Sequence, residues 1–185
     1  MGRRRDPDNR WSVIGAVGAA AGVLGVTALI ARKASGPAPV TQKRVALIGD
    51  SYAVGLGPEL AKRFKDFKYE GRVGISASGW MNCSTCAPWL PDFKPDVVLV
   101  SLGANDGPSP NQADYQSIVR ALHGIGATVE WVMPPAGLAN RAAVRDVIGT
   151  LGVPVVPATH TPLGPDGVHP VSYAPWAAEI ARAVQ

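Results

Sequence analysis

The chain has 185 residues, a length that suits one folded domain with some residues left over. Its 17 Pro and 21 Gly are scattered among apolar blocks rather than gathered in one tract, which excludes a largely disordered chain. The formal net charge of +4 is modest and concentrated near the N-terminus. No stripe of Lys and Arg interleaved with aromatic residues follows, so no nucleic-acid partner is expected.

The first apolar stretch, residues 11–31, carries no charged side chain and is about as long as a helix that crosses a bilayer. Arg10 and Arg32 bracket it, and Trp11 stands where an interfacial aromatic residue would lie. The pattern predicts a transmembrane helix, with a buried core helix as the alternative.

The two segments that flank this helix complete the predicted N-terminal region. Residues 1–10 form a basic tail, and residues 32–43 read as a polar linker interrupted by proline. The apolar run exceeds the core of an ordinary signal peptide, which favours an uncleaved anchor over cleavage and secretion. Basic residues are balanced on the two sides, and a short basic tail favours a cytoplasmic N-terminus with the domain outside the cytoplasm.

Residues 44–185 alternate between apolar runs and amphipathic stretches, with an irregular segment at 76–95. The predicted strands are 44–48, 68–75, 96–102, 128–133 and 153–156. The predicted helices are 53–67, 111–125, 138–151 and 172–184. Strands that alternate with helices and have uniformly apolar interiors indicate a parallel sheet covered on both faces, in a three-layer α/β/α domain.

Polar residues follow the predicted strands where each one ends. The first strand leads into Gly49-Asp50-Ser51, the second into a glycine-containing segment at 74–79, and the third into Gly103-Ala104-Asn105-Asp106. The sequence Asp166-Gly167-Val168-His169 precedes the last helix. Ligands of open parallel sheets bind beyond the carboxyl ends of the strands, so these groups are expected to converge.

The convergent residues have the types that nucleophilic catalysis requires. A serine needs a base within hydrogen-bond reach and a third group that orients the base, and Ser51, His169 and Asp166 could fill these roles. The Asn105 amide is a candidate donor to an oxyanion. Each motif also has an ordinary interpretation, as a helix cap, a strand-end turn or an exposed loop, but their joint occurrence in this order favours catalysis.

The blocks "GDSY", "GAND" and "DGVH" resemble the SGNH (GDSL-type) hydrolases, and the resemblance spans nearly the whole of 44–185. It implies a flavodoxin-like sandwich with Ser51 as nucleophile, His169 as base and Asp166 as its partner. It further implies that the Ser51 amide, Asn105 and a lone glycine stabilise the oxyanion. Gly79 fits that glycine better than Gly74.

The residues around these blocks complete the comparison. The family often has Leu where this chain has Tyr52, a change that leaves the triad intact. Asp50 and Asp106 are expected to order their turns.

Two further side-chain types carry separate predictions. Trp80 and Trp89 flank the predicted site and are candidates for contact with a sugar or acyl group, or for anchoring the loop. Cys83 and Cys86 are too few for a zinc site and form either a loop disulfide or two half-buried thiols.

The sequence therefore predicts a serine esterase that acts through an acyl-serine intermediate, without a cofactor or metal ion. The small domain, which has no inserted lid, favours short acyl groups such as O-acetyl on carbohydrate, and acylated polysaccharide is one candidate partner. A lipase or thioesterase of the same family, or a membrane-anchored binding module without turnover, is the alternative.

Overall fold

The computed structural model describes residues 41–139, 141–159 and 161–184. By its internal contacts the chain divides into two units, Met1–Ala34 and Ser35–Gln185, and the first lies outside the described residues. The second contains one parallel sheet with the strand order β2-β1-β3-β4-β5. The strands are β1 (Thr41–Gly49), β2 (Phe64–Gly71), β3 (Val97–Ser101), β4 (Thr128–Val132) and β5 (Val155–Val156).

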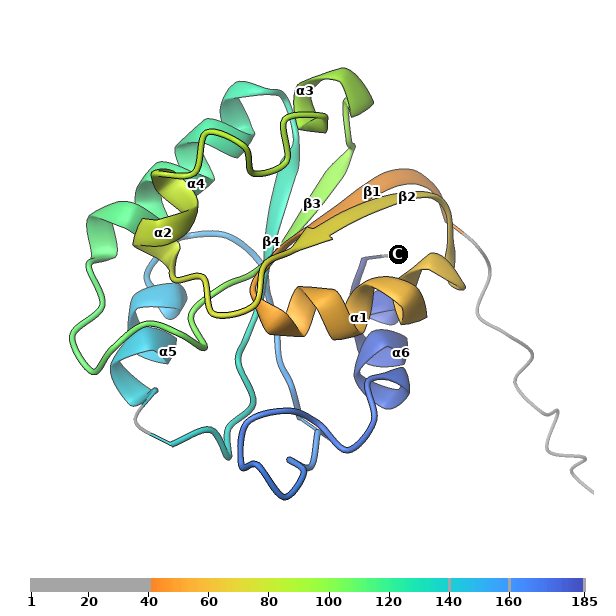
Figure 1. Ribbon diagram of the computed structural model, residues 1–185. Coiled ribbons are helices and arrows are strands. Elements are labelled where there is room, and N and C mark those ends of the chain that lie inside the picture. The colour runs from red at the N-terminus through yellow and green to blue at the C-terminus, as the bar shows by residue number, and fades with distance from the viewer. Residues whose placement is uncertain (1–40, 140, 160, 185) are drawn as a thin grey trace, which may run out of the picture. The chain divides into compact units, whose positions relative to one another are not determined.

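Helices cover both faces of this sheet and make the predicted three-layer sandwich (Figure 1). The helices are α1 (Ser51–Ala61), α2 (Ala77–Met81), α3 (Leu90–Phe93), α4 (Gln112–Gly124), α5 (Ala142–Gly149) and α6 (Ala174–Ala183). Helices α1 and α6 pack on one face, whereas α2, α3, α4 and α5 pack on the other.

Burial explains why the central strands are apolar throughout. Every residue of β3, Val97–Ser101, is buried, because the strand lies between β1 and β4 and has helices above and below it. The two faces carry separate cores. Leu47 and Leu56 belong to the core under α1 and α6, and Ile48 and Ile118 to the core under α2 and α4.

Strand order also fixes where the sheet opens. From β1 the chain passes to β2 on one side of the sheet, and it then adds β3, β4 and β5 on the other side of β1. The carboxyl ends of β1 and β3 are therefore the switch point, where doubly wound sheets leave a crevice for ligands. The segments beginning at Asp50 and Leu102 emerge at this switch point.

Several predicted boundaries are wrong. The helix predicted over 53–67 ends at Ala61, and the strand predicted over 68–75 occupies Phe64–Gly71 instead. Phe64 and Phe67 fit helical spacing, but parallel pairing with β1 buries Phe64 and stacks it on Phe67, with ring centroids 5.9 Å apart. Tertiary pairing thus decided a pattern that local spacing left ambiguous.

The remaining differences lie at element ends and in the irregular segment. Strand β1 begins at Thr41, inside the predicted linker 32–43. Two short helices, α2 and α3, interrupt the segment predicted as irregular over 76–95. Helix α5 begins at Ala142, four residues after the predicted start at 138.

The predicted transmembrane helix, residues 11–31, lies outside the described residues, as does the basic tail 1–10. Within 41–139, 141–159 and 161–184, no helix has the length and apolar character needed to cross a membrane.

Candidate active site

Ser51 lies at the junction between the first strand and the first helix. It is the first residue of α1, and the preceding Asp50 caps the helix by accepting the Tyr52 N–H at 2.9 Å. The Asp50 N–H donates to the Ser101 carbonyl at 2.9 Å, which ties the turn to the end of β3. A Cβ at Gly49 would lie 2.0 Å from the same carbonyl oxygen, so only glycine fits this crossing.

His169 reaches Ser51 from a loop more than a hundred residues later in the chain. Its Nε2 lies 3.0 Å from Ser51 Oγ, and its Nδ1 lies 2.8 Å from Asp166 Oδ2. The three side chains thus form one hydrogen-bonded series in the order that a serine, a base and an orienting carboxylate require. The structure brings together all three predicted triad residues.

The Asp166 carboxylate also organises the backbone around the histidine. Its Oδ1 accepts the N–H groups of Val168 and His169, both at 2.9 Å. These backbone hydrogen bonds, first that of Val168, together with the bond to the His169 ring, lower the pKa of Asp166 to about 2. The carboxylate is therefore ionised at neutral pH, and its side chain is 52% exposed to water, which also favours the charged form.

A tight loop holds this pair in place. The Gly164 N–H donates to the His169 carbonyl at 2.7 Å, and Leu163 pairs with Pro170 in an antiparallel bridge. Gly167 stands between the carboxylate and the base at φ +66°, a backbone conformation that glycine adopts without strain. The loop therefore presents Asp166 and His169 together.

Asn105 follows β3 on the other side of the switch point. Its Nδ2 donates to the Ile75 carbonyl at 3.1 Å. The neighbouring Ala104 N–H donates to Asp50 Oδ2 at 3.3 Å, and the Ala104 carbonyl accepts Arg141 Nε at 2.8 Å. Asp50 consequently links the turn that carries Ser51 with the turn that carries Asn105.

Asp106, the acidic residue of the "GAND" block, plays the corresponding role for α2. Both carboxylate oxygens of Asp106 accept the Ala77 N–H, at 3.3 and 3.2 Å. The expectation that Asp50 and Asp106 order their turns is confirmed. Burial raises the pKa of Asp50 to about 7, and burial likewise raises the pKa of Asp106.

Gly79 lies in α2, where its N–H donates to Ser76 Oγ at 3.0 Å. Ser76 is the cap of this short helix, a role that the sequence analysis did not assign. Because the single amide hydrogen already has an acceptor, the use of Gly79 as an oxyanion donor stays a prediction.

The two tryptophans take positions that differ from each other. Trp80 is buried and lines an apolar pocket of about 210 Å³ between α2, α3 and α4. Trp89 donates its indole N–H to Glu70 Oε2 at 3.2 Å and packs edge-to-face on Phe93. Both indoles thus anchor the segment between α2 and β3, and their contact with a substrate stays a prediction.

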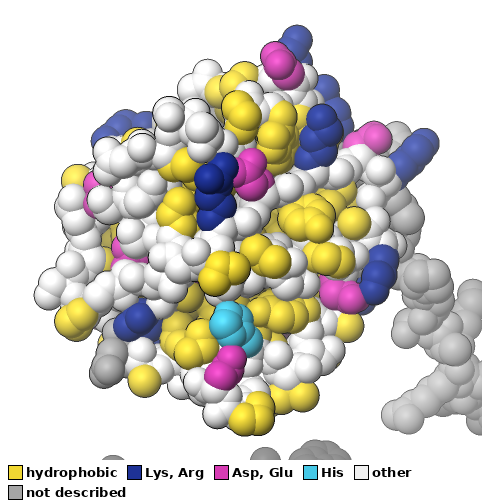
Figure 2. Space-filling view, in the orientation of Figure 1, with side chains coloured by type: hydrophobic (Ala, Val, Ile, Leu, Met, Phe, Trp, Pro, Cys, Tyr) yellow, Lys and Arg dark blue, Asp and Glu magenta, His cyan; other side chains and the backbone are white. Residues whose placement is uncertain are grey.

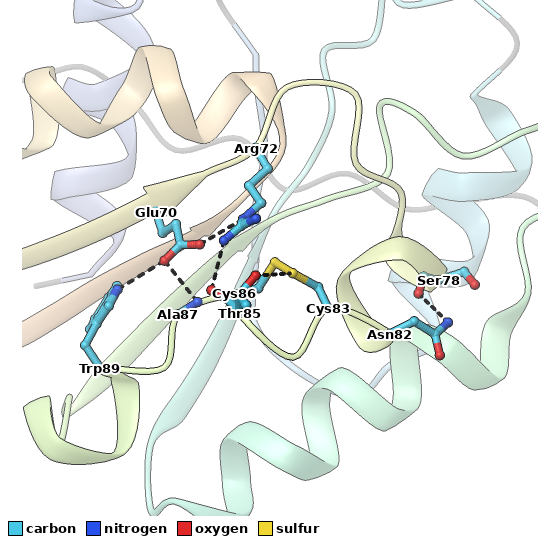
Figure 3. The surroundings of a disulfide bond; sticks show 9 residues. All are labelled: Glu70, Arg72, Ser78, Asn82, Cys83, Thr85, Cys86, Ala87 and Trp89. Atoms are coloured by element: carbon cyan, nitrogen blue, oxygen red, sulfur yellow. Dashed lines mark hydrogen bonds and ion pairs between the residues drawn. A yellow bond between two sulfur atoms is a disulfide. The ribbon is translucent and has the colours of Figure 1, made fainter.

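Cys83 and Cys86 form a disulfide with a Cα–Cα distance of 5.4 Å, which decides between the two alternatives for this pair. Figure 3 shows Glu70 and Arg72 reaching the disulfide loop from the end of β2. Arg72 Nη2 donates to the Thr85 carbonyl at 2.8 Å, and Glu70 Oε2 accepts the Ala87 N–H at 3.0 Å. The loop is therefore closed covalently and fastened to the edge strand.

The surface around the site is largely apolar. On the face shown in Figure 2, an imidazole and a carboxylate lie side by side among hydrophobic side chains. The His169 side chain is 41% exposed. Val171, two residues after it, is 71% exposed, and Val54, one turn after Ser51 on α1, is 41% exposed. The His169 ring and these two valine side chains are therefore open to solvent.

Comparisons with known proteins identify the fold. No protein-family model matches the chain, and no curated protein does. The similar solved structures include three that match over 76–77% of this chain. A lipase/acylhydrolase from Enterococcus faecalis shares 21% identity over 95% of its own length, with a TM-score of 0.54. An acetyl xylan esterase shares 14% identity over its full length, with a TM-score of 0.58.

The third similar structure is the catalytic domain of peptidoglycan O-acetyltransferase A from Streptococcus pneumoniae. It shares 19% identity with this chain over 90% of its own length, with a TM-score of 0.55. Another solved structure of this fold is described as a lipolytic protein of the G-D-S-L family. The described domain therefore has the fold of the SGNH (GDSL-type) hydrolases.

Proposed function

We propose that this protein is a serine esterase that cleaves carboxylic esters through an acyl-Ser51 intermediate. The observation that carries the proposal is the hydrogen-bonded series from Ser51 through His169 to Asp166 at the switch point of the sheet. The fold shared with esterases and lipases supports it.

In the proposed first step, Ser51 Oγ attacks the ester carbonyl and gives its proton to His169 Nε2. The ionised Asp166 accepts the Nδ1–H of the imidazole, fixes its tautomer and stabilises the imidazolium that forms. His169 then donates the proton to the departing alcohol, which leaves an acyl-serine. Water, deprotonated by the same imidazole, releases the acid and restores Ser51.

The developing oxyanion needs donors that are in place before the reaction. The Ser51 N–H lies at the first turn of α1, where backbone amides have no partner within the helix. Asn105 has two N–H hydrogens, and its bond to the Ile75 carbonyl uses one and orients the side chain. We assign the other hydrogen to the oxyanion, with Gly79 as a third donor if its bond to Ser76 is shared.

We further propose short acyl esters on carbohydrate as the substrate class. The exposure of the His169 and Asp166 side chains gives a polymer chain access to the site. Two proteins with this fold are named for acetylated polymers, one an acetyl xylan esterase and the other a peptidoglycan O-acetyltransferase. Lipase or thioesterase activity is the competing assignment, and rates for acyl groups of two to twelve carbons will separate the two.

We propose that the domain works outside the cytoplasm, held by the predicted helix at 11–31. The Cys83–Cys86 disulfide supports this location, because such bonds persist in oxidising compartments. Fractionation of the producing cells, combined with the mass of the mature chain, tests it. A full-length chain in the membrane fraction supports the anchor, and a soluble chain that begins after residue 31 supports secretion.

The catalytic proposal is tested with Ser51→Ala on a nitrophenyl acetate substrate and with a fluorophosphonate probe. The variant should lose at least about 10³-fold in kcat and all labelling, because the nucleophile is removed. Ser117→Ala is the matched control, since this exposed serine on α4 bonds to Ala113 and Arg120 of the same helix. A wild-type protein that neither turns over esters nor takes up the probe would leave a binding module as the function.

A further inference from the structure

Tyr52, the residue directly after Ser51, connects the nucleophile helix to the loop that carries the histidine. Its hydroxyl donates to the Val168 carbonyl at 2.8 Å, across 116 residues of sequence. Given the proposed esterase function, we infer that Tyr52 is a positioning residue that sets the place of His169 relative to Ser51.

The bond acts on the peptide unit that leads into the base. Val168 supplies the carbonyl of this unit and His169 supplies its N–H, which donates to Asp166 Oδ1 at 2.9 Å. The same planar group is therefore held at both ends, by a phenol from α1 and by a carboxylate from its own loop. Fixing this plane fixes the N and Cα atoms of His169, and the bond from the Gly164 N–H to the His169 carbonyl restrains the remaining rotation about φ.

Only one of these two hydrogen bonds connects the loop to another part of the domain. The hydrogen bonds of Asp166 lie within the loop and would move with it. Tyr52, by contrast, is anchored in the core: it is 1% exposed, and its ring packs edge-to-face on Trp176 with centroids 5.4 Å apart. The phenol thus holds the loop at a fixed place relative to α1.

The surroundings of the phenol suit it to this task. The ring also lies edge-on to His169, with centroids 6.0 Å apart and planes at 80°. Burial is the main reason that the pKa of Tyr52 is raised, so the hydroxyl keeps the proton that it donates. Removing this buried donor would leave the partly buried Val168 carbonyl without its hydrogen bond, which costs free energy because water does not easily replace the phenol.

Tyr52→Phe removes the hydroxyl and keeps the ring, so it isolates the bond to Val168. We expect kcat to fall about tenfold or more while KM stays within about twofold, because small displacements of a catalytic group slow the chemical step strongly. The rate of fluorophosphonate labelling at Ser51 should fall in parallel. The matched control is Tyr69→Phe, which removes the hydroxyl of a tyrosine that is 42% exposed on β2 and should retain wild-type kinetics.

A second comparison separates positioning from a general loss of structure. In a His169→Ala background, where no base is left to position, Tyr52→Phe should lower the residual labelling rate less than twofold. A merely structural role would instead reduce the rate equally in both backgrounds, and that result would overturn the inference. So would a Tyr52→Phe enzyme with wild-type kcat. An inactive wild-type protein would refute the esterase proposal itself, which the Ser51→Ala experiment detects independently.

Discussion

Replacing Asp166 by Asn is the most informative test of how the proposed base is controlled. The carboxylate uses Oδ1 for two backbone N–H groups and Oδ2 for the His169 ring. An asparagine can keep its oxygen on the two N–H groups, so the loop is retained. Its NH₂ group then faces Nδ1 as a donor, which forces the imidazole to accept there and to carry its hydrogen on Nε2. In that tautomer His169 cannot take the Ser51 proton.

The expected loss follows from this tautomer and from the exposure of the pair. Exchanging a buried triad carboxylate for its amide lowers kcat about 10⁴-fold. Here the Asp166 side chain is 52% exposed and that of His169 41%, so water can help the ring to reach the productive tautomer. We therefore expect a kcat loss of about 10³-fold for Asp166→Asn, with KM nearly unchanged.

The assay is steady-state hydrolysis of nitrophenyl acetate together with a thermal unfolding scan. Asp92→Asn, at an exposed aspartate in α3, is the matched control and should behave as wild type. The thermal midpoint of Asp166→Asn should stay close to that of the wild type, because the loop bonds survive. An Asp166→Asn variant that keeps more than a tenth of wild-type kcat would refute the assigned role of the carboxylate.

Two further predictions concern the turn that carries Ser51. Gly49→Ala places a Cβ 2.0 Å from the Ser101 carbonyl oxygen and should destabilise the fold by about 3 kcal/mol or more in urea unfolding. Gly124→Ala, where a Cβ meets open space at the end of α4, is its control and should not destabilise the fold; equal stabilities of the two variants would contradict the proposed clash. The pKa of Asp50, raised from 3.8 to about 7, means that the native state binds this proton more tightly than the unfolded chain. Stability should therefore fall as the pH rises from about 4 to 7, by up to about 4 kcal/mol, and Asp50→Asn should flatten that dependence in unfolding curves at several pH values. An unchanged slope in that variant would assign the effect to other groups.

The local motifs indicated where the site residues lie, because Ser51 and Asn105 follow strand ends and Asp166 and His169 lie in the loop before α6. Ser51, Asn105 and the pair Asp166 and His169 follow apolar runs or precede a helix, and the geometry of a parallel sheet brings such positions together. The sequence could therefore indicate the site without showing how any one side chain is oriented.

What the sequence left out depends on contacts between distant residues. The bond from Tyr52 to Val168 joins positions 116 residues apart, and the presence of Tyr where the family often has Leu gave no indication of it. The bond from the Gly79 N–H to Ser76 is a local exception, because it lies in a short helix that the sequence did not predict. The prediction that a helix continues through Phe64 was wrong because pairing of this segment with β1 outweighs its local spacing.

The half-exposed imidazole has a consequence for the fate of an acyl group on Ser51. If Ser51 carries an acyl group as proposed, solvent would reach it beside the half-exposed His169 side chain, and hydrolysis would compete with every other acceptor once the first alcohol departs. A sugar hydroxyl could capture the acyl group only if the polymer stayed docked long enough to displace that solvent. Whether the acyl group is released as an acid or transferred to a sugar would depend on how long the acceptor stays bound at the surface.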